Sequence, residues 1–190
     1  MGKGRIEAFS DGVFAIIITI MVLELHTPDG DSFEALRMIL PAFSGYVLSF
    51  IYIGIYWNNH HHLLHASKRV DGVVLWANLH LLFWLSLVPF ASRWMGDWAF
   101  AGATVSVYGT VLGGAGVAYY LLSRALIRLH GDESVIANAI GRDWKGLMSL
   151  ALYTVSVPLG LAFPLGAVAI YGFVALMWLV PDPRIERAVQ

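Results

Sequence analysis

The residues RIEAFSDGVFAIIITIMVLEL (Arg5–Leu25) join a polar beginning to a long apolar run. A helix of this length measures about 31 Å at 1.5 Å per residue, which matches the hydrocarbon core of one bilayer. The run reaches that length only if Phe9, Ser10 and Asp11 lie inside the membrane. A buried aspartate costs roughly 2.5–3.5 kcal/mol on insertion scales, so another part of the fold must satisfy it. This stretch therefore predicts a membrane-spanning helix that carries its own polar anchor.

The composition of the whole chain is that of an integral membrane protein. Of its 190 residues, 58% are hydrophobic and 13% are charged, and the mean hydropathy is +0.68. A soluble domain of this size does not carry so much apolar surface. The absence of cysteine excludes disulfides, thiolate metal sites and thiol catalysis. We predict a single all-α transmembrane domain that covers residues 1–190.

Apolar segments separated by turn signals and charges predict six transmembrane helices. Proline and glycine close the first segment, and a lysine–arginine pair separates the second from the third. The second helix is expected to continue as a polar helix to about His65. The expected spans are 5–25, 36–57, 70–91, 98–122, 146–163 and 164–180.

Positive charge is distributed unequally between the two ends of these helices. With six spans and a cytoplasmic N-terminus, only Arg37 and Arg93 lie on the side away from the cytoplasm. Cytoplasmic loops carry the excess of lysine and arginine in membrane proteins, so both termini are predicted to be cytoplasmic. The basic residues on the predicted cytoplasmic side are Lys3, Arg5, Lys68, Arg69, Arg124, Arg128, Arg142, Lys145, Arg184 and Arg187.

The fourth span contains Gly109 and Gly113 in a G-x-x-x-G arrangement. Small residues at this spacing let two helices approach closely in lipid. Packing inside one subunit is the favoured interpretation, and a contact between subunits is the alternative.

The first span also carries a stripe formed by Gly12, Ile16, Thr19 and Leu23. These residues follow the positions i, i+4, i+7 and i+11, so they share one narrow side of a helix. From the spacing alone, ordinary packing between helices is the favoured interpretation, and the wall of a pore is the alternative.

Arg5 and Asp11 each need a partner from another helix. They are about 9 Å apart along the first helix and point to nearly opposite sides, so they cannot pair with each other. We therefore expect a hydrogen-bonded network formed by the first three spans. The polar groups available at membrane depth are some hydroxyls and His60, His61, Asn78 and His80.

The motif Arg5-x-x-x-Phe9-Ser10-Asp11 stands at the head of this hydrophobic helix. It resembles the signature of the transmembrane-protein-175 family, the potassium channels of endosomes and lysosomes and their prokaryotic relatives. The resemblance covers about the first half of the chain, and the second half matches only in its number of spans. Further matching positions are Trp57-x-x-His60-x-x-Leu63, Asn78-Leu79 and Pro89.

The resemblance implies a homotetramer whose pore is lined by the first helix, without a re-entrant loop. The sequence contains nothing like Thr-Val-Gly-Tyr-Gly, which excludes selectivity by a carbonyl filter. By position relative to the motif aspartate, the family's constriction corresponds to Ile16 and its second layer to Thr19. Leu23 would form the next layer, and Gly12 would add no side chain to the wall.

A ring of Ile16 side chains around an axis would be narrow and apolar enough to lose its water, so it is the predicted gate and weak selectivity element. Thr19 hydroxyls beside it could replace a few waters of a potassium ion. Potassium is thus the expected permeant species, passing near Ile16 and Thr19. No cofactor and no resident metal is expected.

The histidines at the end of the second span do not predict a metal site. Consecutive histidines on a helix point in directions 100° apart, and no Asp or Glu lies within four residues. We expect His60 in the buried network and the others at the cytoplasmic interface. The residues of this cluster are His60, His61, His62 and His65.

The leading hypothesis is a homotetrameric, potassium-permeable channel in the cytoplasmic membrane of a prokaryote. Its expected partners are other copies of itself and the lipid bilayer, with no nucleic acid and no other protein. An enzyme is not predicted, because the sequence lacks a nucleophile elbow, a glycine-rich phosphate loop and clustered carboxylates at membrane depth.

Two other functions remain as alternatives. A proton-coupled secondary transporter of a cation or small solute could use Asp11 and His60 as a relay. Transporters usually contain an internal repeat, whereas the second half of this chain has no counterpart of Phe9-Ser10-Asp11. The other alternative is a membrane assembly protein that conducts nothing.

Overall fold

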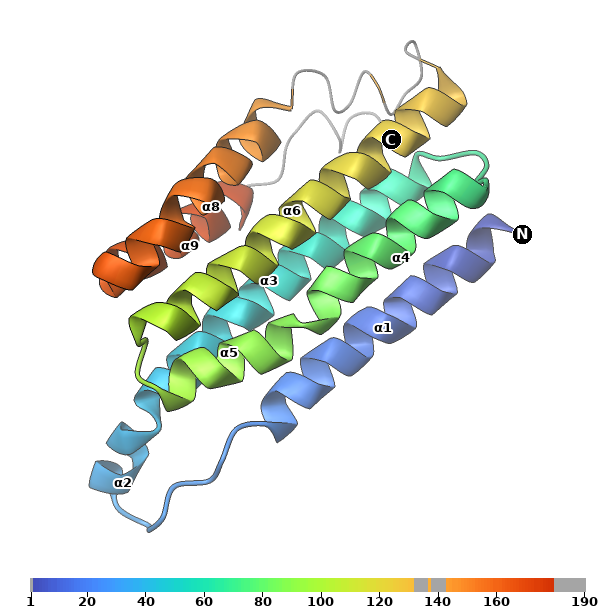
Figure 1. Ribbon diagram of the computed structural model, residues 1–190. Coiled ribbons are helices and arrows are strands. Elements are labelled where there is room, and N and C mark those ends of the chain that lie inside the picture. Colours follow the sequence, from blue (N-terminus) through green and yellow to red (C-terminus); the bar gives the residue numbers. More distant parts are fainter. Residues whose placement is uncertain (1, 132–136, 138–142, 180–190) are drawn as a thin grey trace.

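The computed structural model is an antiparallel bundle of α-helices (Figure 1). It describes residues 2–131, 137 and 143–179, and these ranges contain no β-strand. The helices are α1 (Lys3–Leu23), α2 (Phe33–Met38), α3 (Leu40–His65), α4 (Gly72–Ser86), α5 (Val88–Asp97), α6 (Gly102–His130), α8 (Trp144–Ala162) and α9 (Pro164–Leu179).

Among the described residues, five helical segments are long and apolar enough to cross a bilayer. They are α1, α3, the pair α4–α5, α6 and α8. The last helix, α9, is apolar but has 16 residues, or about 24 Å, which is shorter than a typical bilayer core of about 30 Å. The all-α membrane class is confirmed, and a sixth crossing by α9 stays a prediction.

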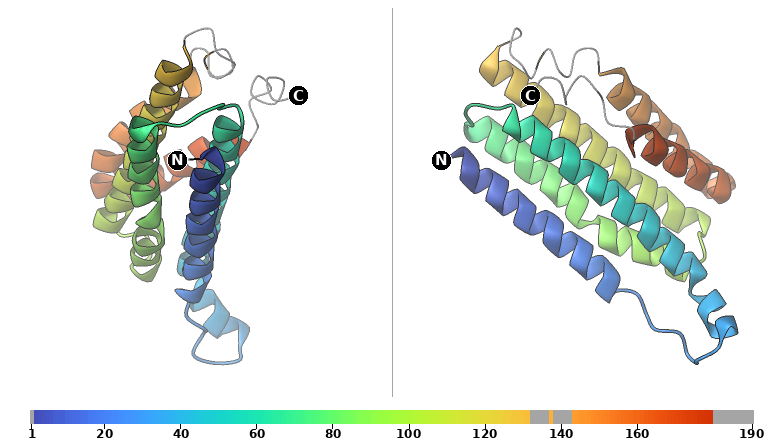
Figure 2. Two further views of the ribbon diagram at one scale, coloured as in Figure 1. Left: turned by 90° about the vertical axis from the view of Figure 1, so that its right-hand side faces the viewer. Right: turned by 180° about the vertical axis from the view of Figure 1, so that it is seen from behind.

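The helices are arranged around α6, which packs against α4, α5, α8 and α9. The hairpin of α8 and α9 forms one edge of the bundle, and α1 forms the opposite edge (Figures 1 and 2). The first helix contacts α3, α4 and α5 with one side only. Its other side therefore has none of the described helices of the same protomer against it.

The third predicted span ends later than the sequence suggested. Instead of stopping at residue 91, the helical segment runs to Asp97, with a break at Leu87 between α4 and α5. Pro89 causes the break, because proline has no N–H to donate and favours the first turn of a new helix. The Leu87 N–H instead bonds to the Trp84 carbonyl at 3.2 Å, one residue short of the α-helical partner.

The fourth predicted span, 98–122, is also corrected. Residues 98–101 form a tight turn in which Ala99 and Phe100 have φ angles of 45° and 62°, and α6 begins at Gly102. At the other end, α6 continues to His130 because residues after 122 still bury one side of the helix. Of the residues in the charge prediction, Arg142, Arg184 and Arg187 lie outside the described residues.

The interior of the bundle is joined by tyrosine and serine hydroxyls. Tyr153 donates to the Tyr52 hydroxyl at 3.2 Å, and Tyr52 donates to the Tyr171 carbonyl at 2.7 Å, so these bonds connect α8, α3 and α9. Ser49 bonds to Ser92 at 2.8 Å and thereby connects α3 to α5. Such bonds satisfy polar groups that lipid could not, and they hold helices that the hydrophobic effect does not press together.

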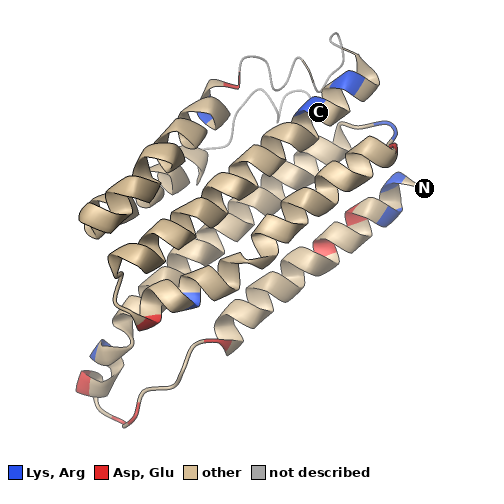
Figure 3. Ribbon diagram, viewed as in Figure 1, with Lys and Arg blue, Asp and Glu red and all other residues tan. Residues whose placement is uncertain are grey.

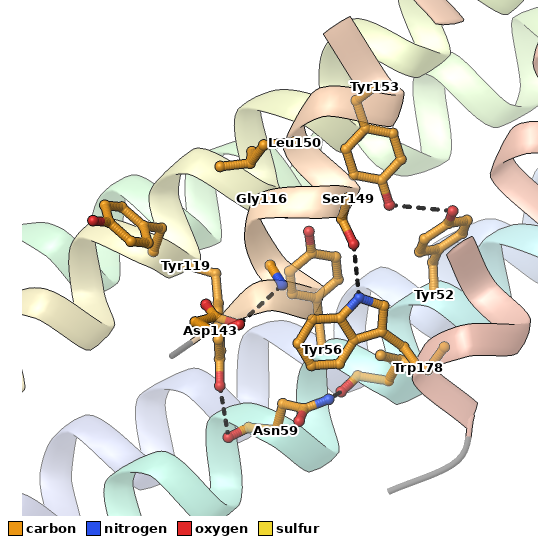
Figure 4. A pocket seen from close by; sticks show the side chains of 13 residues that line it. Tyr52, Tyr56, Asn59, Gly116, Tyr119, Asp143, Ser149, Leu150, Tyr153 and Trp178 are labelled. Atoms are coloured by element: carbon orange, nitrogen blue, oxygen red, sulfur yellow. Dashed lines mark hydrogen bonds between the residues drawn. The ribbon is translucent and has the colours of Figure 1, made fainter. Parts of the chain in front are cut away.

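A small cavity of about 50 Å³ lies between α3, α6, α8 and α9 (Figure 4). Aromatic side chains surround it, and Trp178 closes one side by donating its indole N–H to Ser149 at 2.9 Å. Tyr56 and Tyr119 meet edge to face, with ring centroids 6.2 Å apart. The cavity lies inside one protomer, on the far side of α3 from α1, so it does not belong to the exposed side of α1.

The glycines of α6 serve contacts inside the protomer. A Cβ at Gly109 would overlap the Tyr171 hydroxyl, and a Cβ at Gly114 would overlap the Trp84 indole. A Cβ at Gly113 would meet only the Tyr153 Cβ, at 3.5 Å, which is an ordinary contact. The close approach of α6 to α4 and α9 therefore depends on Gly109 and Gly114.

Lysines and arginines gather at the end of the bundle that holds the N-terminus and the end of α6 (Figure 3). The opposite end holds Arg37 and Arg93 together with several acidic residues. This is the asymmetry expected when one end of a membrane protein faces the cytoplasm.

Candidate pore helix and its polar anchor

The first helix has two sides of different character. On the side that packs on α3, α4 and α5, buried residues recur every three or four positions, as they do along one side of a helix. This side is apolar except at Ser10. The buried residues are Ile6, Ser10, Phe14, Ile17 and Met21.

The stripe formed by Gly12, Ile16, Thr19 and Leu23 lies on the other side of α1. The Ile16 side chain is 58% exposed and that of Leu23 is 79% exposed. Nothing lies within 4 Å of a Cβ placed on Gly12. Within the part of the protomer that the structure describes, the stripe therefore packs against no helix, in contrast to the interpretation that spacing alone favoured.

Thr19 is the one polar side chain of this stripe. Its hydroxyl donates to main-chain carbonyls of its own helix, with distances of 2.9 Å to Ile16 and 3.1 Å to Ala15. Because the proton is directed back at the helix, the lone pairs of Oγ1 are left as the exposed part of the group. Threonine oxygens with their lone pairs exposed in this way can coordinate a cation.

Ser10 anchors the buried side of α1 through a network of three side chains. The Asn78 amide donates to Ser10 Oγ at 3.0 Å, and Asn78 Oδ1 lies 2.7 Å from His60 Nε2. Since Oδ1 can only accept, His60 is the donor and carries its proton on Nε2. All three residues are at most 2% exposed, so the network connects α1, α4 and α3 inside the bundle.

Arg5, Phe9 and Asp11 lie outside this buried network, which differs from the prediction. Each is exposed in the protomer. Asp11 accepts a hydrogen bond from the Trp57 indole at 3.0 Å. The reason is helical geometry: Ser10 points to the neighbouring helices, and Asp11, turned by 100°, points past them to the edge of α3.

The N-terminal end of α1 and the C-terminal end of α3 are joined by a further contact that the sequence did not suggest. The ammonium group of Lys3 donates to the His65 carbonyl at 3.0 Å and lies 3.6 Å from Glu7. His61 stacks between Trp57 and His65, with ring centroids 6.1 Å and 5.9 Å away. No group of three or more metal-binding side chains occurs in the described part of the chain.

Arg93 holds the opposite end of α1. Its guanidinium donates to Glu24 at the C-terminus of α1, to His26 at 2.6 Å and to Asp97 at 3.3 Å. Sequence reasoning counted Arg93 only as a charge on the outer side. The spacing of Arg93 and Asp97, four residues apart on α5, was the available signal for part of this cluster.

Comparison with known proteins identifies this arrangement. The family model for the endosomal/lysosomal potassium channel TMEM175 matches residues 5–89. A potassium channel of Chryseobacterium sp. (strain P1-3) is 50% identical over 190 residues, which are 100% of this chain and 99% of that protein. The chain belongs to the TMEM175 family. The matched residues of the TMEM175 model include the exposed stripe, Ser10, His60 and Asn78.

Two more TMEM175 proteins show how far the likeness extends. The crystal structure of a lysosomal potassium-selective channel TMEM175 homolog from Chamaesiphon minutus matches with a TM-score of 0.83 at 27% identity, over 95% of this chain and 97% of that one. The human endosomal/lysosomal proton channel TMEM175 is 36% identical over 96 residues, 44% of this chain and 19% of that protein. The predicted family is therefore confirmed. These proteins are named as channels, which also confirms that the function is not enzymatic.

Proposed function

We propose that this chain forms a potassium-permeable cation channel in which α1 of each subunit lines a central pore. The exposed stripe of α1 carries the proposal, because it points away from α3, α4 and α5. Several copies with their stripes turned to one axis would enclose a passage. The similarity to proteins named as potassium channels supports potassium as the permeant ion.

The assembly that we propose is a homotetramer in the cytoplasmic membrane of a prokaryotic cell. Each subunit, residues 1–190, acts as one channel domain with six crossings and both termini in the cytoplasm. The subunit number rests on the family resemblance. The gathering of basic residues at one end supports the orientation, and full-length similarity to a bacterial protein supports the location.

Ile16 is the proposed gate. An apolar ring excludes water when it is narrow, since water inside it lacks hydrogen-bond partners. The side chain is large and projects freely from the protomer. Ion passage then requires the ring to widen, and Leu23 adds a second apolar layer toward the outer end.

Thr19 is the proposed ion-contacting layer. Its hydroxyl proton is held by carbonyls of α1, so its oxygen presents lone pairs toward the axis and can replace part of a hydration shell. Potassium gives up its hydration more cheaply than sodium does. We therefore expect a weak preference for potassium, set by Thr19 and by the width at Ile16.

The anchor formed by Ser10, Asn78 and His60 sets the rotation of α1 about its own axis. Ser10 is about 120° from Ile16 around the helix. Fixing Ser10 to Asn78 therefore turns Ile16 away from the protomer and toward the proposed axis. These residues have a structural role in this proposal, and the alternative relay of protons through His60 is not needed.

Single-channel recording in planar bilayers tests the proposal. Purified protein under opposed potassium and sodium gradients should give unitary currents that reverse toward the potassium potential. Ile16→Asn should enlarge the current or reduce its selectivity, because a polar ring does not exclude water. Val22→Asn is the matched control, since Val22 is also exposed on α1 but lies outside the stripe.

Two results would contradict the proposal. Equal currents in wild type and Ile16→Asn would discard the pore wall at this stripe. Slow, saturable uptake into liposomes without unitary steps would instead support the proton-coupled transporter.

A further inference from the structure

All the exposed residues of α6 lie on one line along the helix. Their spacings of seven, four and three residues keep them within about 60° of one another around the helix axis. The line is apolar or uncharged over most of its length and basic at its end. Its members are Ala103, Thr110, Val117, Leu121, Arg124 and Arg128.

Arg124 and Arg128 are one helical turn apart on this line and border a surface cavity of about 390 Å³. Neither makes an ion pair with a carboxylate of the described residues. The Arg124 guanidinium lies over the Tyr120 ring, 5.7 Å from its centroid. This contact orients the group without neutralising it. Two guanidinium groups therefore border the same hollow, and no carboxylate among the described residues neutralises them.

The loop between α3 and α4 brings more positive charge to this end of α6. His130 Nε2 accepts the main-chain N–H groups of Lys68 at 3.1 Å and Arg69 at 3.3 Å. The Arg69 guanidinium donates to the Leu129 carbonyl at 3.1 Å. The loop is thus fixed to the end of α6, and the potential there is the sum of charges from two elements.

The length of α6 places the arginines at the depth of lipid phosphates. Its 29 residues span about 43 Å, whereas a bilayer core is about 30 Å thick. Even with a common tilt of about 20°, the last two turns extend beyond the hydrocarbon. Trp144, which begins α8 at the same end, is exposed as an interfacial tryptophan would be.

Below the arginines, the same line borders a groove suited to an acyl chain. A cavity of about 360 Å³ between α6 and α8 is lined by Thr110, Gly113 and Val117 on one side and by Leu150 and Val157 on the other. The distance from Val117 to Arg124 is about 10 Å along the helix. An apolar groove that leads to two cationic side chains is complementary to an anionic lipid, which has an apolar acyl chain and a negatively charged headgroup.

We propose that this line on α6 binds one anionic phospholipid of the cytoplasmic leaflet. Arg124 and Arg128 hold the headgroup phosphate through charge-assisted hydrogen bonds, and an acyl chain lies in the groove between α6 and α8. Lys68 and Arg69 add attraction at longer range. The site is on the opposite side of the bundle from the exposed stripe of α1, so it does not depend on the proposed pore.

Native mass spectrometry of the purified full-length protein tests the site with phosphatidylglycerol and phosphatidylcholine as probes. Wild type should retain phosphatidylglycerol preferentially. Each basic residue near an anionic surface contributes about 1 kcal/mol, which corresponds to a factor of about five in binding. Arg124→Gln and Arg128→Gln should each reduce the bound fraction of phosphatidylglycerol by about that factor, and retention of phosphatidylcholine should not change.

Two variants separate the parts of the site. Arg37→Gln removes the same charge at the opposite end of the bundle and should leave retention unchanged. Gly113→Leu fills the groove, where an added Cβ makes only an ordinary contact with the Tyr153 Cβ, at 3.5 Å, and should reduce retention of both lipids. Unfolding temperatures near that of wild type show that each variant has folded.

Three outcomes would overturn the proposal. Equal retention of both lipids by wild type would show no anionic site. Displacement of phosphatidylglycerol by millimolar inorganic phosphate would indicate a general anion site without a lipid groove. A change in oligomeric mass in the arginine variants, with lipid retention unaltered, would show that the line is a contact between copies of the chain.

Discussion

His60 and Asn78 meet inside the protomer through a 2.7 Å hydrogen bond between Nε2 and Oδ1. Because the Asn78 amide also donates to Ser10 at 3.0 Å, one side chain of α4 joins α3 to α1. The network pairs these buried polar groups with one another, which suits membrane depth. The Phe14 ring covers it, with its centroid 5.5 Å from that of His60.

Asn78→Ala should destabilise the protein by roughly 2–6 kcal/mol, because it leaves Ser10 and His60 buried without partners, at about 1–3 kcal/mol each. Asn59→Ala is the control, since the Asn59 amide bonds only to Ile55 in its own helix. It should cost about 1 kcal/mol or less. Denaturant unfolding in detergent measures both, and similar losses would show that the network contributes little.

Thr19→Val should lower the potassium-to-sodium permeability ratio toward unity while conduction persists, because valine keeps the shape of threonine and removes its oxygen. Thr154→Val is the matched control: Thr154 on α8 also bonds back to its own helix, at 2.8 Å to Leu150. Reversal potentials measured under opposed potassium and sodium gradients give the permeability ratio of each variant. An unchanged ratio in Thr19→Val would remove this residue from the selectivity element.

Gly114→Ala and Gly109→Ala should each destabilise the bundle by about 1–3 kcal/mol, the usual effect of overpacking, since the new methyl group overlaps Trp84 or Tyr171. Gly113→Ala, one residue away in the same helix, should be neutral or slightly stabilising because alanine favours helices. Thermal unfolding of the three purified variants is the measurement. A loss in Gly113→Ala as large as in the others would contradict this account of the packing.

Glu24→Gln should lower the unfolding temperature less than Asn78→Ala does, because the ion pair of Glu24 with Arg93 is partly exposed. The difference from wild type should vanish in high salt, which screens exposed pairs. Lys3→Gln provides a comparison at the other end of α1. An effect that is insensitive to salt would mean that Glu24 acts through packing rather than charge.

The first helix was predictable because its signals are local. A polar group inside an apolar run needs a partner, and the chain has few at that depth, so His60 and Asn78 are among the few candidates that the sequence offers, together with His61, His80 and some hydroxyls. The stripe with Ile16 was equally visible as a periodicity. The sequence does not show whether this stripe faces the protomer or points away from it, because the spacing of residues is the same on a buried and an exposed side of a helix.

Other features depend on lateral positions that a sequence does not contain. Trp57 reaches Asp11, and Arg93 reaches Glu24, across 46 and 69 residues of chain. Nothing in the local sequence of either residue indicates its partner. The extension of α6 to His130 was missed for another reason: its last turns are amphipathic, and the charges of Arg124 and Arg128 lower the hydropathy by which a span is recognised.

Among the described residues, the polar contacts of α1 with other helices lie in its first half, from Lys3 to Asp11, and at Glu24 after its last turn. Lys3, Ser10 and Asp11 bond to α3 and α4 on one side, and Glu24 bonds to α5 on the other. Between Gly12 and Leu23, no hydrogen bond or ion pair joins α1 to another helix among the described residues, and the Phe14 ring packs on the ring of His60. In the proposed channel, Ile16 can therefore move away from the pore axis without any loss of hydrogen bonds between α1 and the helices around it.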